Sequence, residues 1–220
     1  SGDVSDVREL MSTSFHMERT PKFFEDAKDI RVRTRTRATA IDRSNKTVHL
    51  VDLATGKEED LPYDHLVLAV GSRPNSLPVP GADLPGVMSL GNLRSAIEIK
   101  DLIARGKVGK AVIIGAGAIG CEMAEALSER GLAVDLIKPR AGLLPWLDPA
   151  LSQPVRELLV ARGVGVHDGY PIERIIAEGE QLRVIAGELR LEADVVIAAI
   201  GVTPNASLAR EAGLDVSVGG

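Results

Sequence analysis

The sequence predicts an α/β fold in which one structural unit occurs twice. The segment 64–75 (DHLVLAVGSRPN) recurs without a gap as 194–205 (DVVIAAIGVTPN). In both copies a short apolar run ends at a glycine and then a proline, which is typical of a buried parallel strand that ends in a tight turn. The string GAGAIG at 115–120 follows another apolar run and occurs once. We therefore expect two related halves, of which the first lacks its own glycine loop.

The first half is expected to hold a helix and an antiparallel meander. Thr20 and Pro21 precede KFFEDAK, a pattern typical of a helix N-cap with proline at the first helical position. Alternation and polar turns predict antiparallel strands at 31–41, at 47–53 and just before Tyr63, and these lead to a buried parallel strand at 66–70. The Pro- and Gly-rich stretch 72–86 predicts a connector.

The second half reads as a βαβ unit followed by a copy of the meander. In chain order we expect a helix at 92–105, a strand at 111–114, a helix at 118–130, a strand at 133–138 and a helix from Asp148 to about 161. The stretch 164–191 is expected to repeat the meander, and 195–200 to repeat its final strand. Both halves therefore follow one plan.

The glycine loop has the residue types that dinucleotide binding requires. Gly115 allows a tight turn after the strand, Gly117 lets the backbone approach a pyrophosphate, and Gly120 lets the helix pack closely. The amino end of the following helix offers free N–H groups and positive potential. The pattern alone is weak, but here it lies between a strand and an alanine-rich helix, as the motif demands. The alternative is a glycine turn that serves packing only.

Composition excludes several function classes. The formal net charge of −5 predicts no general affinity for nucleic acid or an anionic membrane. One cysteine cannot form an internal disulfide, and the four histidines lack the spacing of metal ligands. No apolar run approaches the roughly 20 residues of a membrane span, and no signal peptide opens the chain. We expect a cytoplasmic protein without a metal site.

The spacing of the repeat predicts that the chain is a piece of a longer protein. Gly115 precedes Gly201 by 86 residues. An equivalent loop serving Gly71 would lie before residue 1. The far end, GLDVSVGG, stops directly after a helical segment without a closing strand.

At this point the residues carry a family resemblance. The chain resembles the flavin-dependent pyridine nucleotide-disulfide oxidoreductases, and within them the branch of coenzyme A-disulfide reductase, NADH oxidase and NADH peroxidase. The matching stretches are ERTPKFF, RATAIDRSNKTV, YDHLVLAVGSRP, NLRSAIEIKDLI, VIIGAGAIGCEMAEAL, LLPWLDPAL and VVIAAIGVTPN. The resemblance implies that hydride passes from NAD(P)H to FAD and on to a cysteine-based centre that reduces a small-molecule electron acceptor.

The resemblance also implies a domain plan. Residues 1–92 would be part of the FAD-binding domain, 93–215 a Rossmann-like NAD(P)H-binding domain, and 216–220 the start of the return to the FAD domain. The full-length parent would be a homodimer. The flavin phosphate loop and the redox cysteine would fall outside the chain, so we expect this fragment to be inactive alone.

Site residues follow position by position from the resemblance. Ala38 would lie near the flavin adenine, and Ala69, Gly71 and Arg73 near the flavin-binding edge. The nicotinamide dinucleotide would be held by Gly115, Gly117, Ala118, Ile119 and Gly120, with Glu122 beside the nicotinamide carboxamide and Ile200 and Gly201 below the ring. Ala118 replaces the aromatic residue often found there, so the nicotinamide pocket is expected to stand open.

Cys121 and Trp146 have a structural and a functional interpretation each. Cys121 follows Gly120 inside the nucleotide helix, and we expect a small buried thiol rather than a reactive one. Trp146 is expected to pack over the loop that follows the nucleotide strand, with stacking on a ligand as the alternative. No residue of the chain is assigned a catalytic role.

The end of the second nucleotide strand predicts which cofactor is used. Lys138 lies 23 residues after Gly115, where NAD-selective relatives carry a carboxylate that binds the adenosine ribose. Lys138 and Arg140 would instead attract a 2′-phosphate. We expect at least about a tenfold preference for NADPH over NADH, reversed by Lys138→Glu. The alternative is that Lys138 points into solvent and both cofactors, NADP and NAD, are tolerated.

Two classes of function stay open at this stage. The chain is either part of a flavin-linked reductase of a disulfide, dioxygen or peroxide, or a non-catalytic nucleotide-binding or electron-transfer module similar to the ferredoxin reductases. A cysteine encoded just upstream of Ser1 would favour the first class.

Overall fold

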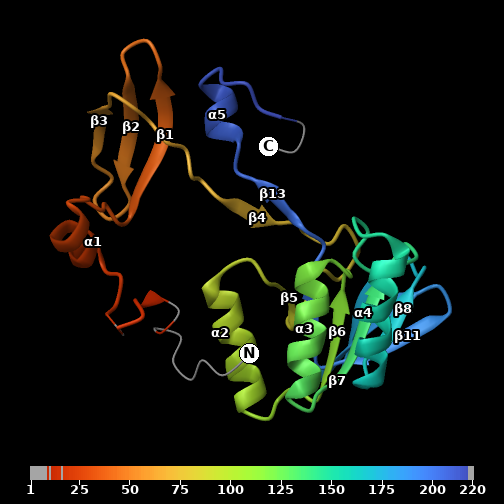
Figure 1. Cartoon of the computed structure of the whole chain (residues 1–220). Coiled ribbons are helices and arrows are strands. Elements are labelled where there is room, and N and C mark those ends of the chain that lie inside the picture. Colours follow the sequence, from red (N-terminus) through yellow and green to blue (C-terminus); the bar gives the residue numbers. More distant parts are fainter. Residues whose placement is uncertain (1–8, 10, 16, 218–220) are drawn as a thin grey trace. The chain divides into compact units, whose positions relative to one another are not determined.

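The chain forms two compact units. A computed structural model describes residue 9, residues 11–15 and residues 17–217. Unit 1 comprises residues 1–72 and 204–220, and unit 2 comprises residues 73–203. Figure 1 shows the elements of both units. The domain boundaries expected from the sequence, after residues 92 and 215, separate an FAD-binding part from an NAD(P)H-binding part. These boundaries stay a prediction.

Unit 2 is built on a five-stranded parallel sheet. The strand order is β5 (Val87–Ser89), β12 (Val195–Ala198), β6 (Lys110–Ile114), β7 (Ala133–Lys138) and β8 (Gly165–Asp168). All four neighbouring pairs are parallel. This sheet confirms the predicted α/β fold and its βαβ unit, in which α3 (Ala118–Glu129) connects β6 and β7.

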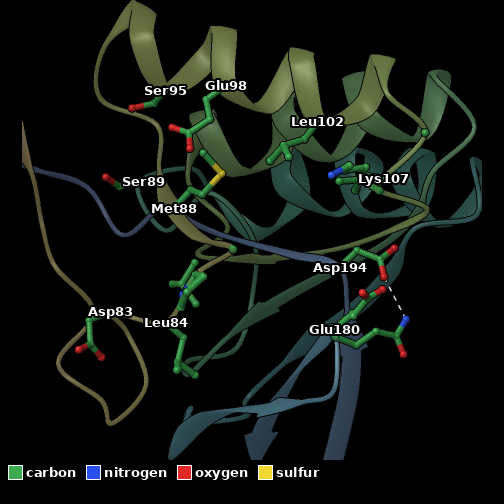
Figure 2. A pocket seen from close by; sticks show the side chains of 16 residues that line it. Asp83, Leu84, Met88, Ser89, Ser95, Glu98, Leu102, Lys107, Glu180 and Asp194 are labelled. Carbon is green, nitrogen blue, oxygen red and sulfur yellow. Dashed lines mark hydrogen bonds between the residues drawn. The ribbon is translucent and has the colours of Figure 1, made fainter.

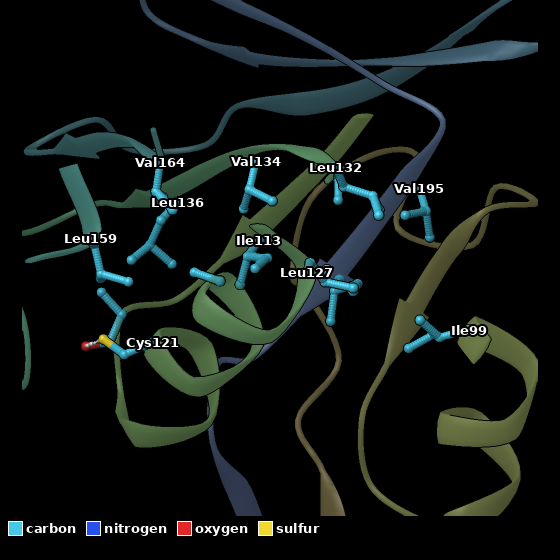
Figure 3. Packing of buried hydrophobic residues seen from close by; sticks show 14 of the residues in the cluster. Ile99, Ile113, Cys121, Leu127, Leu132, Val134, Leu136, Leu159, Val164 and Val195 are labelled. Carbon is cyan, nitrogen blue, oxygen red and sulfur yellow. Dashed lines mark hydrogen bonds between the residues drawn. The ribbon is translucent and has the colours of Figure 1, made fainter. Parts of the chain in front are cut away.

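Both faces of this sheet are covered. Helices α2 (Leu93–Ala104), α3 and α4 (Pro149–Ala161) lie on one face, and the antiparallel sheet of β9 (Arg174–Glu178), β10 (Gln181–Ala186) and β11 (Leu189–Ala193) lies on the other. Ile113 packs toward the helices, whereas Val112 and Ile114 pack toward the antiparallel sheet. Figure 3 shows the helix side, where Leu127 and Cys121 of α3 face the strands. Burial on both faces explains why β12 and most of β6 are continuous apolar runs.

The helices of unit 2 begin where their sequence signals predict. The Asn92 side chain accepts a hydrogen bond from Ser95 N at 3.0 Å, and the Asp148 side chain accepts one from Ala150 N at 2.8 Å. Pro149 follows Asp148 at the first helical position. Residues 165–168 were expected in the second meander, but they form β8 and join the parallel sheet. Hydrophobic alternation cannot separate these two outcomes in so short a run.

Unit 1 contains the first meander. Its antiparallel sheet has the order β1 (Thr36–Asp42), β2 (Thr47–Asp52) and β3 (Glu58–Pro62), and its helices are α1 (Pro21–Lys28) and α5 (Ser207–Glu211). The predicted cap of α1 is confirmed, because the Thr20 side chain accepts a hydrogen bond from Phe23 N at 3.2 Å. β1 starts five residues later than the expected 31–41, since Arg35 has a φ of 56° that breaks an extended strand.

The predicted buried strand at 66–70 is wrong. This segment has no strand, and Leu66, Val67 and Val70 are 37%, 84% and 44% exposed. Its counterpart β12 lies between β5 and β6. In the described part of unit 1, no strand pairs with residues 66–70. A parallel strand becomes buried only when neighbouring strands and helices cover it.

The ends of the two repeat copies nevertheless have matching structures. In unit 2, Asn75 donates from N to Gly201 O at 3.0 Å and from Nδ2 to Ile200 O at 3.3 Å. In unit 1, Asn205 donates from N to Gly71 O at 2.9 Å and from Nδ2 to Val70 O at 2.9 Å. Two short strands, β4 (Ser72–Pro74) and β13 (Val202–Pro204), pair there. The asparagine that ends each copy therefore holds the glycine turn of the other copy.

Candidate nucleotide-binding site

Two glycines of the loop after β6 are required by close backbone packing. Gly115 has a φ of 112°, and a Cβ there would collide with Ala199 O and lie 2.8 Å from its carbonyl carbon. A Cβ at Gly120 would collide with Gly115 O and lie 3.0 Å from Gly115 C. Neither position can hold a side chain unless the backbone moves. The turn and the start of α3 are therefore pressed against the end of β12.

Gly117 occupies a different environment. Its φ is −80°, and a Cβ there would meet only the Trp146 ring, at 3.7 Å, an ordinary contact distance. Gly117 is the N-cap of α3, and no side chain caps this end of the helix. The first turn holds the exposed residues Ala118 and Ile119. An uncapped helix amino end offers N–H donors and positive potential to an anion.

The end of β12 lies beside the glycine loop. Ala199 N donates to Ile114 O at 2.8 Å, directly before Gly115. Ile200 is half-buried, and Gly201 is exposed with a φ of 89°. Unit 2 thus brings the glycine loop, Ile200 and Gly201 together at the carboxyl edge of the sheet, where open α/β sheets bind ligands. Glu122 is exposed one turn further along α3.

The β7–α4 loop, residues 139–147, folds back onto the glycine loop. Leu144 N donates to Ala116 O at 2.9 Å, and Gly142 N donates to Asp168 Oδ2 at 2.8 Å. Lys138, the last residue of β7, is only 8% exposed, and its Nζ donates to Gly142 O. The alternative that Lys138 points into solvent is therefore wrong. Arg140 is exposed.

Asp168 is a charged residue of this edge that sequence reasoning missed. Its Oδ1 accepts a hydrogen bond from Arg156 of α4 at 2.7 Å, and its Oδ2 accepts the one from Gly142. The Gly142 N–H, followed by the hydrogen bond and charge of Arg156, holds the pKa of Asp168 below its usual value despite partial burial. The sequence feature that could have identified Asp168 is its position, because a carboxylate that ends the run GVGVHD falls at the carboxyl end of a strand.

Trp146 and Cys121 flank the loop. Trp146 is 62% exposed, and its ring lies over Gly117. The packing expected for Trp146 is thus only partial, and stacking on a ligand stays open. Cys121 is 8% exposed, and burial raises the pKa of its thiol. A buried thiol with a raised pKa is a poor nucleophile, in line with the structural role expected for it.

The residues expected to contact flavin lie elsewhere. Ala38 is exposed in β1, opposite Leu50 and beside a register shift. Ala69 and Gly71 are exposed in unit 1, and Arg73 is exposed in β4. Among the described residues, no hydrogen bond joins these positions to one another. Their role as flavin contacts stays a prediction.

One cavity of unit 2 is away from the glycine loop. It has a volume of about 1250 Å³ and is lined by α2, β5 and the residues that precede β6 and β12. In Figure 2, Glu98 of α2 lies on one side of this space, and Asp194 and Glu180 lie on the other. Asp194 Oδ2 accepts hydrogen bonds from Gly109 N at 2.7 Å and Lys110 N at 2.8 Å. Acidic residues at the amino edge of the sheet are unsuited to phosphate.

In the described part of the chain, no group of three or more His, Cys, Asp or Glu residues could hold a metal ion. None of the helices in residues 9, 11–15 and 17–217 has the length and apolar character needed to cross a membrane.

Known proteins resemble this chain over most of its length. The sequence profile described as "Pyridine nucleotide-disulphide oxidoreductase" matches residues 3–220. An NADH oxidase of Methanocaldococcus jannaschii is 34% identical over 90% of this chain and 44% of its own. A rubredoxin-NAD(+) reductase of Alcanivorax borkumensis is 36% identical over 91% of this chain and 51% of its own.

A solved structure gives the same result. The NAD-dependent persulfide reductase from A. fulgidus superposes with a TM-score of 0.91 and is 37% identical, over 98% of this chain and 40% of its own. The chain therefore spans about half or less of the length of each of these three proteins.

Proposed function

The chain belongs to the pyridine nucleotide-disulphide oxidoreductase family, and on that premise we propose that unit 2 binds NADPH at the glycine loop. The observation that carries this proposal is the uncapped amino end of α3 at the carboxyl edge of a parallel sheet. Gly117 supports it further, because a Cβ there would meet no backbone atom and only the ring of the exposed Trp146, so that close packing does not explain the glycine, whereas the approach of a pyrophosphate would. Packing alone requires glycine at 115 and 120, but not at 117.

The proposed preference for NADPH rests on two cations, Lys138 at the end of β7 and Arg140 just after it. Arg140 is exposed, and we assign it the direct contact with the 2′-phosphate. Lys138 adds positive potential from beneath the loop. A charge-assisted hydrogen bond to the phosphate contributes roughly 1.5–3 kcal/mol. The names of the three relatives specify NADH or NAD, so the choice of cofactor is a proposal from this chain's own residues.

The family uses FAD and NAD(P)H, and we place the chain in a protein that oxidises NAD(P)H. The bound cofactors supply hydride transfer from nicotinamide to flavin. The chain's own residues bind and orient the donor: α3 and Gly117 hold the pyrophosphate, Ile200 and Gly201 support the nicotinamide, and Glu122 orients the carboxamide. Electrons would pass on to a disulfide, dioxygen or peroxide in a full-length, homodimeric protein, whereas this chain alone would not turn over.

The described residues of unit 1 do not form a complete flavin site. Ala69 and Gly71 are exposed and belong to no parallel sheet, and unit 1 has no glycine loop between a strand and a helix in its described part. We therefore assign Ala38, Ala69, Gly71 and Arg73 to flavin binding only in the full-length protein.

A second candidate function is electron transfer to a redox protein. It is favoured by the likeness to the rubredoxin-NAD(+) reductase of Alcanivorax borkumensis, which is 36% identical. Both candidates share the nucleotide site. They are separated by offering the full-length protein NADPH with either a low-molecular-weight disulfide or a small iron–sulphur protein and measuring which one is reduced.

Binding titrations of the unmutated chain with NADPH and NADH test the nucleotide proposal. We expect NADPH to bind about tenfold more tightly, a difference of roughly 1.4 kcal/mol, and Arg140→Glu to reverse the preference. Arg105→Glu makes the same charge change at the end of α2 and should alter neither affinity. Lys138→Glu is a poorer test, because its carboxylate would face Gly142 O. Equal affinities would refute the selectivity, and no binding of either nucleotide would refute the site.

A further inference from the structure

The β7–α4 loop is held at its centre from both sides. The Gly142 peptide donates its N–H to Asp168 Oδ2 at 2.8 Å, and its carbonyl oxygen accepts a hydrogen bond from Lys138 Nζ. Leu144 N, two residues further on, donates to Ala116 O at 2.9 Å and so ties the loop to the glycine loop. Gly142 has a φ of 76°, a conformation that other residues rarely adopt.

These contacts leave Arg140 little freedom of position. β7 ends at Lys138, and the hydrogen-bonded peptide of Gly142 follows after only three residues, Pro139, Arg140 and Ala141. The proline ring fixes one further dihedral angle at the start of this span. Arg140 is exposed, and no hydrogen bond or ion pair of its side chain is described. Its backbone is therefore held in place, while its guanidinium is free for a ligand.

Asp168 is in turn held by a residue from another element. Its backbone is paired in register with Lys138 at the ends of β8 and β7, which brings its carboxylate beneath the loop. Arg156 of α4 donates to the second carboxylate oxygen at 2.7 Å. With Gly142 bound to one oxygen and Arg156 to the other, the carboxylate has one orientation in which both hydrogen bonds are made.

We propose that Asp168 and Arg156 are positioning residues for cofactor selection, which act on the 2′-phosphate through Gly142 and Arg140. Neither residue needs to touch the nucleotide. Their effect is to order the loop before binding, so that less conformational freedom is lost when Arg140 meets the phosphate. This inference rests on the proposed nucleotide site. It gives Lys138 the role of holding the Gly142 carbonyl group, in place of a direct contact with the ribose.

The test uses two probes that differ in the 2′-phosphate: adenosine 2′,5′-bisphosphate and adenosine 5′-monophosphate. Each is titrated against the unmutated chain and the Arg156→Leu and Asp168→Asn variants, and the ratio of the two affinities is the readout. General destabilisation lowers both affinities together, whereas a misplaced Arg140 lowers only the affinity for the bisphosphate. We expect the ratio to fall by about fivefold in both variants.

Arg162→Leu is the matched control. Arg162 is the C-cap residue of α4, the helix that holds Arg156. Its side chain is 35% exposed against 33% for Arg156, and it also forms ion pairs, but with Glu125 and Glu129. We expect this variant to keep the ratio of the unmutated chain. A fall of the same size in Arg162→Leu would overturn the inference, because the loss of any ion pair on α4 would then suffice.

The remaining outcomes separate this inference from the proposal on which it rests. If Arg140→Gln lowers the ratio while Arg156→Leu and Asp168→Asn leave it unchanged, the positioning role is refuted and the nucleotide site stands. If the unmutated chain binds neither probe, both are refuted. A variant that binds adenosine 5′-monophosphate normally is folded at this site, so either variant suffices to decide the question.

Discussion

Gly117 and Gly120, three residues apart in one loop, should respond to the same substitution in opposite ways. In Gly120→Ala the new methyl group would collide with Gly115 O and lie 3.0 Å from Gly115 C, where ordinary contacts begin at 3.4 Å. Both atoms belong to the backbone, so no side-chain rotation relieves the overlap. In Gly117→Ala the methyl group would meet only the Trp146 ring, at 3.7 Å, and the φ of −80° suits alanine.

The expected magnitudes follow from this geometry. Overpacking of a close contact lowers the free energy of unfolding by about 1–3 kcal/mol, occasionally more. Replacing glycine by alanine inside a helix raises it by about 0.8–1.0 kcal/mol. Because the overlap involves backbone on both sides, we take the upper part of the range and expect Gly120→Ala to lower the free energy of unfolding by about 2 kcal/mol. For Gly117→Ala we expect a change within about 0.5 kcal/mol, but at least about a tenfold loss of NADPH affinity.

Urea unfolding followed by circular dichroism, together with calorimetric NADPH titration, measures both effects on the same preparations. A Gly120→Ala variant as stable as the unmutated chain would refute the packing argument. Unchanged NADPH affinity in a folded Gly117→Ala variant would remove this loop from the nucleotide site. Each variant serves as the other's control, since the chemical change is identical.

Three further predictions concern pH, the thiol and flavin. Burial raises the pKa of Asp194, but hydrogen bonds from one side-chain amide and two backbone N–H groups outweigh it and leave the pKa below its usual value. The stability that Asp194 contributes is thus present above about pH 4 and is lost as the pH falls through the folded-state pKa. Below about pH 4, the urea midpoint should therefore fall less steeply with decreasing pH in Asp194→Asn than in the unmutated chain. Burial raises the pKa of Cys121, so a thiol reagent should label it slowly in the native chain and rapidly in urea; equal rates would contradict its burial. Because Gly71 is exposed outside any parallel sheet, the purified chain should be colourless, and a stoichiometric flavin absorption band would contradict this expectation.

Much of unit 2, and the start of α1 in unit 1, could be predicted from local sequence signals. The runs that became β6, β7 and β12 are mostly apolar, and such runs are buried on both faces of a parallel sheet. Thr20, Asn92 and Asp148 start helices because each side chain caps N–H groups only two or three residues away. The spacing of the glycines likewise predicted the loop at 115–120, because the glycines that such a loop needs all lie within one short turn.

The features that the sequence could not determine depend on partners far along the chain. The segments 66–70 and 195–198 share one pattern, yet only the second is buried, because only it has strands on both sides. Lys138 ends its strand as expected, and its ammonium donates to the carbonyl group of Gly142 only four residues on, but the N–H of that same peptide is held by Asp168, 26 residues further along the chain. Asp168 enters the site through parallel pairing across thirty residues. Secondary structure and caps follow from neighbours in sequence, whereas burial and the direction of a charged side chain are decided by whichever distant groups the fold places beside it.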